Sequence, residues 1–125
     1  MIYKLKTAKR TQEIFEKIQA SQFLAPYILS KLAISLSLSK TDKEYVLDFE
    51  TDNAGLELNR QTITGEYDLF YKSLVAIAEG KHISDEEFFP KYIKAHLDRG
   101  AIMLENEFRY SSNLIEHLAN LEKSI

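Results

Sequence analysis

The densest group of polar side chains in this sequence lies in the stretch GLELNRQTITGEYD, residues 55–68. Two carboxylates, Glu57 and Glu66, stand on either side of Arg60 there. Paired carboxylates and a histidine can carry out acid–base or metal-assisted, nuclease-like hydrolysis. The histidine would have to come from the distant segment KAHLDRG. An enzyme built in this way would use Glu57, Arg60, Glu66, His96 and Arg99.

The same stretch also has a structural interpretation. Arg60 carries five N–H donors, enough to bridge Glu57, Glu66 and backbone carbonyls at once. This role would lock the connection between the N-terminal half of the chain and the helix expected from Thr64. Arg60 could equally present its guanidinium to a phosphate group. The locking role is the simpler interpretation, and Arg60 stays a candidate phosphate contact.

Composition removes several classes of chemistry. The chain has no cysteine, which excludes disulfides, cysteine-ligated zinc, iron–sulfur clusters and a thiol nucleophile. His96 has no second ligand three or four residues along a helix, and the acidic run at residues 85–87 suits a first helical turn. Gly55 and Gly65 stand alone and so form no phosphate-binding loop. We therefore expect no metal, no cofactor and no catalytic residue.

The charge is distributed unevenly along the chain. The formal net charge is −3, yet residues 1–40 hold seven basic and two acidic residues, a net +5, so the remainder carries −8. Such an asymmetry is typical of a basic contact surface on an acidic body, although surface charges also cluster by chance. The candidate DNA contacts are Lys4, Lys6, Lys9, Arg10, Lys17, Lys31 and Arg60.

Hydrophobic spacing predicts one mainly helical domain over residues 1–125. Residues 2–7 alternate as a half-buried strand does, and apolar residues at helical spacing come next over residues 11–22, with Thr11 as the expected cap. Pro26 suits the first turn of a second helix. The chain should therefore begin with a strand and two helices, and continue into a further helical bundle.

The middle of the chain contains one ambiguous segment and one clear helix. Residues 45–49 alternate briefly, as either a strand or a loop would. Thr64 should cap a helix, Glu66 favours its positive end, and Gly80 should end it. The apolar stripe expected to face the core is Leu69, Phe70, Leu74 and Ile77.

The C-terminal third is predicted from caps and breakers. Ser84 stands three residues before a glutamate, the spacing of a capping box. Pro90 should break or kink the chain near its own position, which leaves a helix near residues 89–98 that Gly100 closes and another over 101–108. The last helix should begin near residue 113 and bury Leu114, Ile115, Leu118 and Leu121.

A lone N-terminal strand leaves its backbone groups unpaired unless another segment supplies a partner. We expect that partner to be the same strand, residues 2–7, of a second chain. The alternative is pairing with residues 45–49. A two-chain ribbon with Lys4 and Lys6 on its outer face, leading into two helices, has the outline of a ribbon-helix-helix DNA-binding protein.

Three segments carry a resemblance to a known family. The run G-x-E-x-N-R…T-x-T-G-E-Y-D of residues 55–68 is similar to a hallmark of DndE, a family of the DNA phosphorothioation system. KAHLDRG resembles the same family through His96, Arg99 and Gly100, and so does APYILSKLAISLSL at the proline helix. One departure is that the family has a Thr-Gly turn before that helix, where this chain has SQFL, residues 21–24.

The resemblance implies a non-catalytic protein that binds double-stranded DNA, preferentially nicked DNA, as a homotetramer with a ribbon-helix-helix-like fold. It also implies partners among the other phosphorothioation proteins. The absence of cysteine agrees with a part played on the DNA, since this chain cannot carry the sulfur itself. Structural roles are expected for Gly55, Glu57, Asn59, Thr64, Gly65, Glu66, His96, Arg99 and Gly100.

The predicted function is a DNA-binding, homo-oligomeric component of the phosphorothioation machinery. The alternative is a scaffold that assembles the other proteins of the pathway with little DNA contact, and the acidic residues after position 40 support it. No apolar run is long enough to cross a bilayer, and the N-terminus lacks a signal core, so we expect a cytoplasmic protein without membrane contact.

Overall fold

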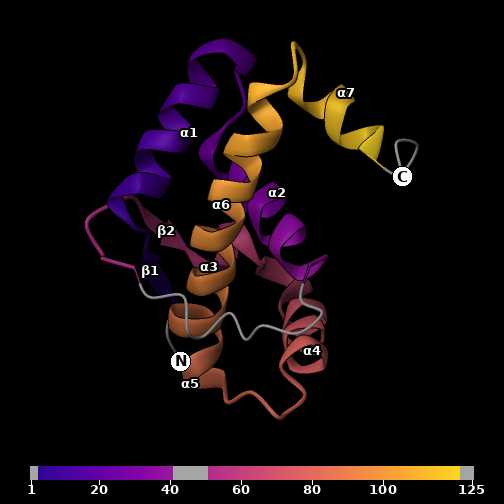
Figure 1. Ribbon diagram of the computed structural model, residues 1–125. Coiled ribbons are helices and arrows are strands. Elements are labelled where there is room, and N and C mark those ends of the chain that lie inside the picture. The colour runs from indigo at the N-terminus through magenta and orange to yellow at the C-terminus, as the bar shows by residue number, and fades with distance from the viewer. Residues whose placement is uncertain (1–2, 41–50, 122–125) are drawn as a thin grey trace.

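A computed structural model describes residues 3–40 and 51–121, and these residues are predominantly helical. Three long helices, α1 (Lys9–Gln22), α2 (Pro26–Leu38) and α6 (Lys94–Arg109), lie side by side in Figure 1. Helix α6 packs along α2 and also contacts α1. Their facing surfaces bury large apolar side chains, among them Phe15, Ile34 and Leu104. Helices α1, α2 and α6 together form the helical core of the protein.

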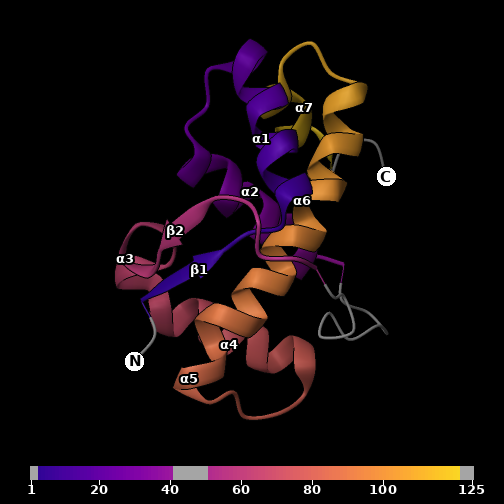
Figure 2. The same cartoon turned by 90° about the vertical axis from the view of Figure 1, so that its left-hand side faces the viewer.

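The N-terminal strand pairs within its own chain. Strand β1 (Lys4–Lys6) runs antiparallel to β2 (Glu57–Asn59), with Leu5 opposite Leu58. The expected partner, a strand from a second chain, is therefore wrong for this edge of β1. The alternative partner, residues 45–49, lies outside the described residues. The predicted order of strand, helix and helix is confirmed, and Figure 2 shows β1 leading directly into α1.

Helix α1 begins two residues earlier than predicted. Its N-cap is Ala8, and Thr11, the expected cap, is a buried residue inside the first turn. The helix ends at Phe23, which adopts the left-handed conformation with φ of 57°. Pro26 opens α2 as predicted, because its missing N–H and fixed φ suit a first turn.

The middle of the chain forms short helical pieces and one longer helix. These are α3 (Arg60–Ile63), the 3₁₀ helix η2 (Gly65–Tyr67) and α4 (Asp68–Glu79), which Gly80 ends with φ of 70° as predicted. The predicted core-facing stripe is wrong in three places, since Leu69, Phe70 and Ile77 are 76%, 61% and 77% exposed. Only one edge of α4 reaches the core, through Val75.

The C-terminal third is more continuous than predicted. Ser84 caps α5 (Asp85–Glu87) as expected, accepting a hydrogen bond from the amide of Glu87. The chain then passes through a π-helix, η3 (Phe88–Ile93), into α6 without a break. A wider π turn accommodates Pro90, whose ring would crowd an ordinary α turn.

Gly100 lies inside α6 and does not end it. A Cβ atom on Gly100 would stand 1.8 Å from the carbonyl oxygen of Ala33, so the glycine permits the close approach of α6 and α2. After α6 comes α7 (Leu114–Ala119), in which Leu114 is buried as predicted, whereas Ile115 is 45% exposed. A short helix that packs against the core through one face buries only the apolar residues on that face.

Candidate nucleic-acid interface

Three basic side chains from two helices converge on one carboxylate. Arg10 and Lys17 of α1 lie 3.3 Å and 3.8 Å from the carboxylate oxygens of Glu105 in α6, and Arg109 lies 3.6 Å away. The Glu105 side chain is 11% exposed, whereas the three basic side chains are 56–63% exposed. We call Arg10, Lys17 and Arg109 the cationic cluster.

Among residues 3–40 and 51–121, Glu105 is the one carboxylate paired with the cationic cluster, and it does not neutralise the three cations. Three cations face one carboxylate, so the group carries a net charge of about +2. Arginine forks and a lysine ammonium that remain open to solvent can contact phosphate oxygens. The sequence analysis identified Arg10 and Lys17 but missed Arg109 and Glu105. The spacing of Glu105 and Arg109, four residues apart on one helix, was the only local signal for them.

The other candidate lysines are not among the side chains that converge on Glu105. Lys4, Lys6 and Lys9 are exposed along β1 and the start of α1, and Lys4 lies 3.7 Å from Glu57. Lys31 is on α2, where its ammonium stands 5.7 Å from the centre of the Tyr27 ring. The structure therefore brings together two of the predicted cations and adds a third, while the rest extend the basic surface along β1, α1 and α2.

Arg60 is buried, with 4% of its surface exposed. Its Nε donates to Asp68 at 2.9 Å, one terminal nitrogen also contacts Asp68, and a 2.8 Å bond reaches Asp85. The face of the Phe88 ring covers the guanidinium at 5.1 Å. The predicted lock is present, but its carboxylates are Asp68 and Asp85 where Glu57 and Glu66 were expected.

The lock of Arg60 shifts the pKa of each charged partner. Hydrogen bonds to Asp68 raise the pKa of Arg60, with Asp85 adding to the effect. Burial raises the pKa of Asp68, but the hydrogen bonds from Arg60 and Thr64 outweigh it and leave that pKa lowered. The Arg60 hydrogen bond also lowers the pKa of Asp85. All three groups are therefore held in their charged forms at neutral pH.

The remaining residues of the 55–68 stretch shape the backbone. The side chain of Asn59 accepts a hydrogen bond from the amide of Gln61 and caps α3. The Thr64 hydroxyl contacts the carboxylate of Asp68 at 2.5 Å. Gly55 lies against Thr7, where a Cβ would stand 2.2 Å from the threonine hydroxyl oxygen. Gly65 begins η2 with a positive φ of 46°, and Glu66 is the next residue of that short helix.

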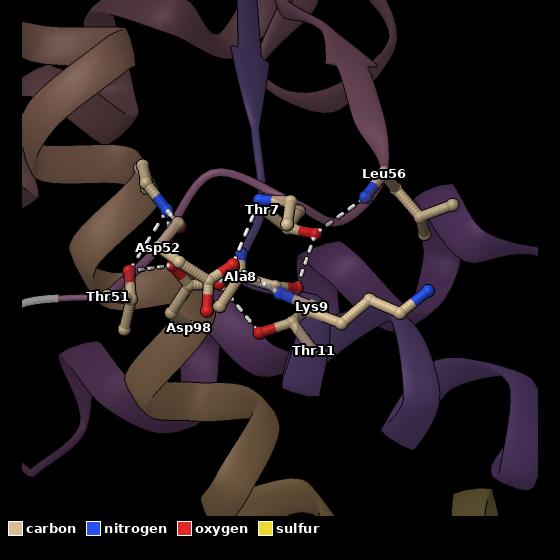
Figure 3. A network of polar contacts seen from close by, with 10 residues as sticks. Thr7, Ala8, Lys9, Thr11, Thr51, Asp52, Leu56 and Asp98 are labelled. Carbon is tan, nitrogen blue, oxygen red and sulfur yellow. Dashed lines mark hydrogen bonds and ion pairs between the residues drawn. The ribbon is translucent and has the colours of Figure 1, made fainter.

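Asp98 ties three segments of the chain together, as Figure 3 shows. It accepts hydrogen bonds from the amide of Ala8 at 3.1 Å and from the hydroxyls of Thr11 and Thr51 at 2.6 Å each. The ammonium of Lys94 completes the set at 2.7 Å. The sequence analysis missed Asp98 as a cap because its partners lie up to ninety residues away.

The neighbouring residues of α6 hold the C-terminal end of α2. Arg99 donates to the backbone carbonyls of Ser37 and Lys40, at 2.9 Å and 2.6 Å. The Ser37 hydroxyl lies 2.8 Å from Nδ1 of His96, which is fully buried. Burial, with a smaller contribution from Arg99, lowers the pKa of His96 to about 4. The imidazole is therefore a neutral packing group at neutral pH.

The residues of the hydrolytic alternative are separately engaged. Glu57 pairs with Lys4, Arg60 with Asp68 and Asp85, and His96 with Ser37. Within residues 3–40 and 51–121, no group of three or more histidine, aspartate or glutamate side chains could hold a metal ion. The exposed cationic cluster on helices α1 and α6 is instead the arrangement able to contact an anion.

Comparison with known families agrees with this arrangement of elements. The family model of the DNA sulphur modification protein DndE matches residues 4–112, from β1 to the end of α6 and just beyond it. The chain belongs to the DndE family. The DndE match includes the cationic cluster, the lock of Arg60 and the caps supplied by α6, and it stops before α7.

Solved DndE structures share the fold. The crystal structure of DndE from Escherichia coli B7A, described as involved in DNA phosphorothioation modification, superposes with a TM-score of 0.62 at 18% identity and covers 83% of this chain and 98% of its own. The DndE G21/24K mutant gives a TM-score of 0.61 at 15% identity and covers 82% and 97%. No curated protein sequence matches. Among the described residues, no helix is long and apolar enough to span a membrane.

Proposed function

We propose that this protein is a non-catalytic DNA-binding component of the DNA phosphorothioation machinery, acting in the cytoplasm on double-stranded and preferentially nicked DNA. The observation that carries the proposal is the cationic cluster, in which three exposed cations of α1 and α6 share one largely buried carboxylate. Membership of the DndE family, a family of DNA sulphur modification proteins, supplies the pathway.

Phosphate binding is the chemistry that this surface supports best. Lysine and arginine contacts to phosphate position a protein on DNA without reading its sequence. Helices α1 and α6 hold the cationic cluster in place, so little ordering is needed when DNA binds. The exposed lysines of β1, such as Lys4 and Lys6, would extend the contact along the duplex. Arg60 is excluded from this set by its burial and its two carboxylate partners.

The protein is further proposed to act as a homotetramer. One copy offers a net charge of about +2 at the cationic cluster, and several copies in one assembly would multiply such weak contacts. The exposed apolar residues of α4, namely Leu69, Phe70 and Ile77, form what we call the α4 face, and burial between copies would remove them from water.

The first test is the binding of the purified protein to nicked, intact and single-stranded DNA of equal length at several salt concentrations. The proposal predicts tightest binding to the nicked duplex and an affinity that falls steeply with salt, because neutralised phosphates release counterions. Binding that does not depend on salt, or no binding near physiological salt, would overturn it. Light scattering on the same sample measures the oligomeric state.

A second candidate function is a scaffold for the other phosphorothioation proteins. The α4 face favours it, since an exposed apolar stripe can dock a different protein as readily as a second copy. Ile77→Ser separates the two. If the α4 face joins identical copies, the variant should fall to a smaller oligomer in light scattering, whereas a scaffold would keep its oligomeric state and lose a partner protein.

A further inference from the structure

We propose that Phe23 and Tyr110 form an aromatic end of the molecule that stacks on the bases laid open at a nick in the duplex. This inference rests on the proposed DNA-binding function and names the feature of the DNA that would be recognised. Phe23 and Tyr110 are 88% and 82% exposed, the highest values among the large hydrophobic side chains of the described residues.

The conformation of Phe23 shows that the fold does not need this side chain. Its φ of 57° is one that bulky residues rarely adopt, and it is the only residue other than glycine with a positive φ in the described part of the chain. The ring buries almost none of its surface, so packing does not offset the backbone strain. Strain held at an exposed aromatic residue points to a role outside the fold.

The turn that carries Phe23 is tied to the segment that follows Tyr110. The Gln22 side chain accepts a hydrogen bond from the amide of Leu114 at 2.8 Å, and its Nε2 lies 3.5 Å from the carbonyl oxygen of Ser112. The C-terminal ends of α1 and α6 therefore meet at one end of the molecule, which both views show at the top (Figures 1 and 2). Both aromatic side chains are presented from anchored turns.

Positive charge adjoins this aromatic end. Tyr110 directly follows Arg109, a member of the cationic cluster that also includes Lys17. Lys31 of α2 stands over the half-exposed ring of Tyr27, which lies in the first turn of that helix and follows Phe23 closely in the sequence. Cations that hold phosphates beside aromatic rings that accept bases are the combination by which proteins bind unpaired or unstacked nucleotides. The α4 face differs, because two of its three residues are aliphatic and cannot stack.

A nick is the feature of duplex DNA that would admit these rings. In an intact duplex each base face is covered by its neighbours, and opening a step requires unstacking against a continuous backbone. At an interrupted strand the step can open at lower cost, since flanking nucleotides move independently. The cationic cluster would then hold the duplex, and the aromatic end would supply the preference for a nick.

The test compares binding of intact and centrally nicked duplexes by wild type and by Phe23→Gly. Glycine adopts the left-handed conformation freely, so this variant should fold at least as well. We expect the preference for nicked DNA to drop by about fivefold to a hundredfold, the range of one base–aromatic stack. Affinity for intact duplex should change less than about twofold. Tyr67→Ser, which removes another exposed aromatic residue away from this end, should leave the preference unchanged.

A second variant reports stacking directly. The chain contains no tryptophan, so Phe23→Trp introduces a single indole. Its emission should be quenched by nicked duplex and much less by intact duplex. An unchanged preference in Phe23→Gly, or equal emission on both duplexes, would overturn the inference, as would a wild type that binds both duplexes equally. A smaller oligomer for Phe23→Gly would also overturn it and assign the turn to contact between copies. Failure of wild type to bind any DNA would instead reject the proposed function.

Discussion

Asp98 accepts a hydrogen bond from the backbone amide of Ala8 at 3.1 Å, across ninety residues of sequence. A carboxylate from α6 thereby satisfies the amide of the N-cap residue of α1, as the glutamate of a capping box does, while Ala8 itself has no side chain able to cap the helix. The next residue, Arg99, donates to backbone carbonyls at the C-terminal end of α2. Each charge has the sign that complements the helix dipole it faces.

The cap predicts a specific loss of stability. Asp98→Asn keeps the shape of the side chain but leaves the ammonium of Lys94, which is 13% exposed, without its carboxylate. We expect the free energy of unfolding in urea to fall by about 2–4 kcal/mol. Asp52→Asn is the control, because this exposed carboxylate also accepts an α1 amide, that of Lys9, and should cost less than about 1 kcal/mol. Equal losses in the two variants would contradict the role given to Asp98.

Gly100 provides a test of the α2–α6 contact. In an isolated helix Gly100→Ala would gain about 1 kcal/mol of helix propensity. Here the new Cβ would lie 1.8 Å from the carbonyl oxygen of Ala33, so we expect a loss of more than about 2 kcal/mol instead. Gly80→Asn, at a helix end with open space around it, should cost less than about 1 kcal/mol. A stabilised Gly100→Ala protein would show that the helices are not in close contact.

Arg60 should matter for folding and not for DNA. Arg60→Lys replaces a planar fork that contacts both Asp68 and Asp85 with a single ammonium. The free energy of unfolding should fall by about 2–3 kcal/mol, while the salt dependence of DNA binding stays that of wild type. The opposite pattern, a reduced salt dependence with unchanged stability, would place Arg60 on the DNA.

His96 makes stability depend on pH within a defined window. Its pKa is lowered to about 4 in the folded protein from 6.5, so the unfolded chain takes up the proton first as the pH falls. Stability from this group is complete above pH 6.5 and is lost between pH 6.5 and about 4, by up to about 3 kcal/mol. Asp68 and Asp85, whose pKa values are lowered from 3.8, contribute only below this window.

His96→Asn is the matching variant, because its amide can stand near the position of Nδ1 beside Ser37. Urea unfolding measured every half pH unit should show a flatter profile between pH 6.5 and 4 than wild type. A variant profile that retains the full wild-type slope would show that another group titrates in this window.

Local signals in the sequence predicted the elements well. Alternation predicted β1, Pro26 predicted the start of α2, Gly80 predicted the end of α4, and Ser84 predicted the cap of α5. Each of these four predictions depends only on residues that are close together in the sequence. The 55–68 stretch was also predicted to hold an arginine lock, which is present, but the predicted carboxylates Glu57 and Glu66 were wrong.

Long-range relationships could not be predicted in the same way. The partner of β1 lies more than fifty residues away in β2, and no local pattern distinguishes it from a second chain. Gly100 was expected to end a helix because its contact with Ala33 is not visible in the sequence. Leu69, Phe70 and Ile77 of α4 were assigned to a core stripe from their spacing, yet these three residues face outward. The cationic cluster could not be predicted, because its residues meet only when α1 and α6 lie side by side.

The measurement that tests the central claim most directly is the salt dependence of DNA binding by a triple variant, Arg10→Gln, Lys17→Gln and Arg109→Gln. Two single variants complete the comparison. Lys91→Gln removes an exposed, ion-paired lysine before the opposite end of α6 and should behave as wild type. Glu105→Gln frees the cationic cluster from its carboxylate and should tighten binding.

Each phosphate contact contributes about 1 to the slope of log affinity against log salt. If the cationic cluster binds DNA, the slope of the triple variant should be smaller than that of wild type by about 2–3, with weaker binding at every salt concentration. A triple variant that retains its fold by circular dichroism and binds DNA with the wild-type slope and affinity would contradict the account.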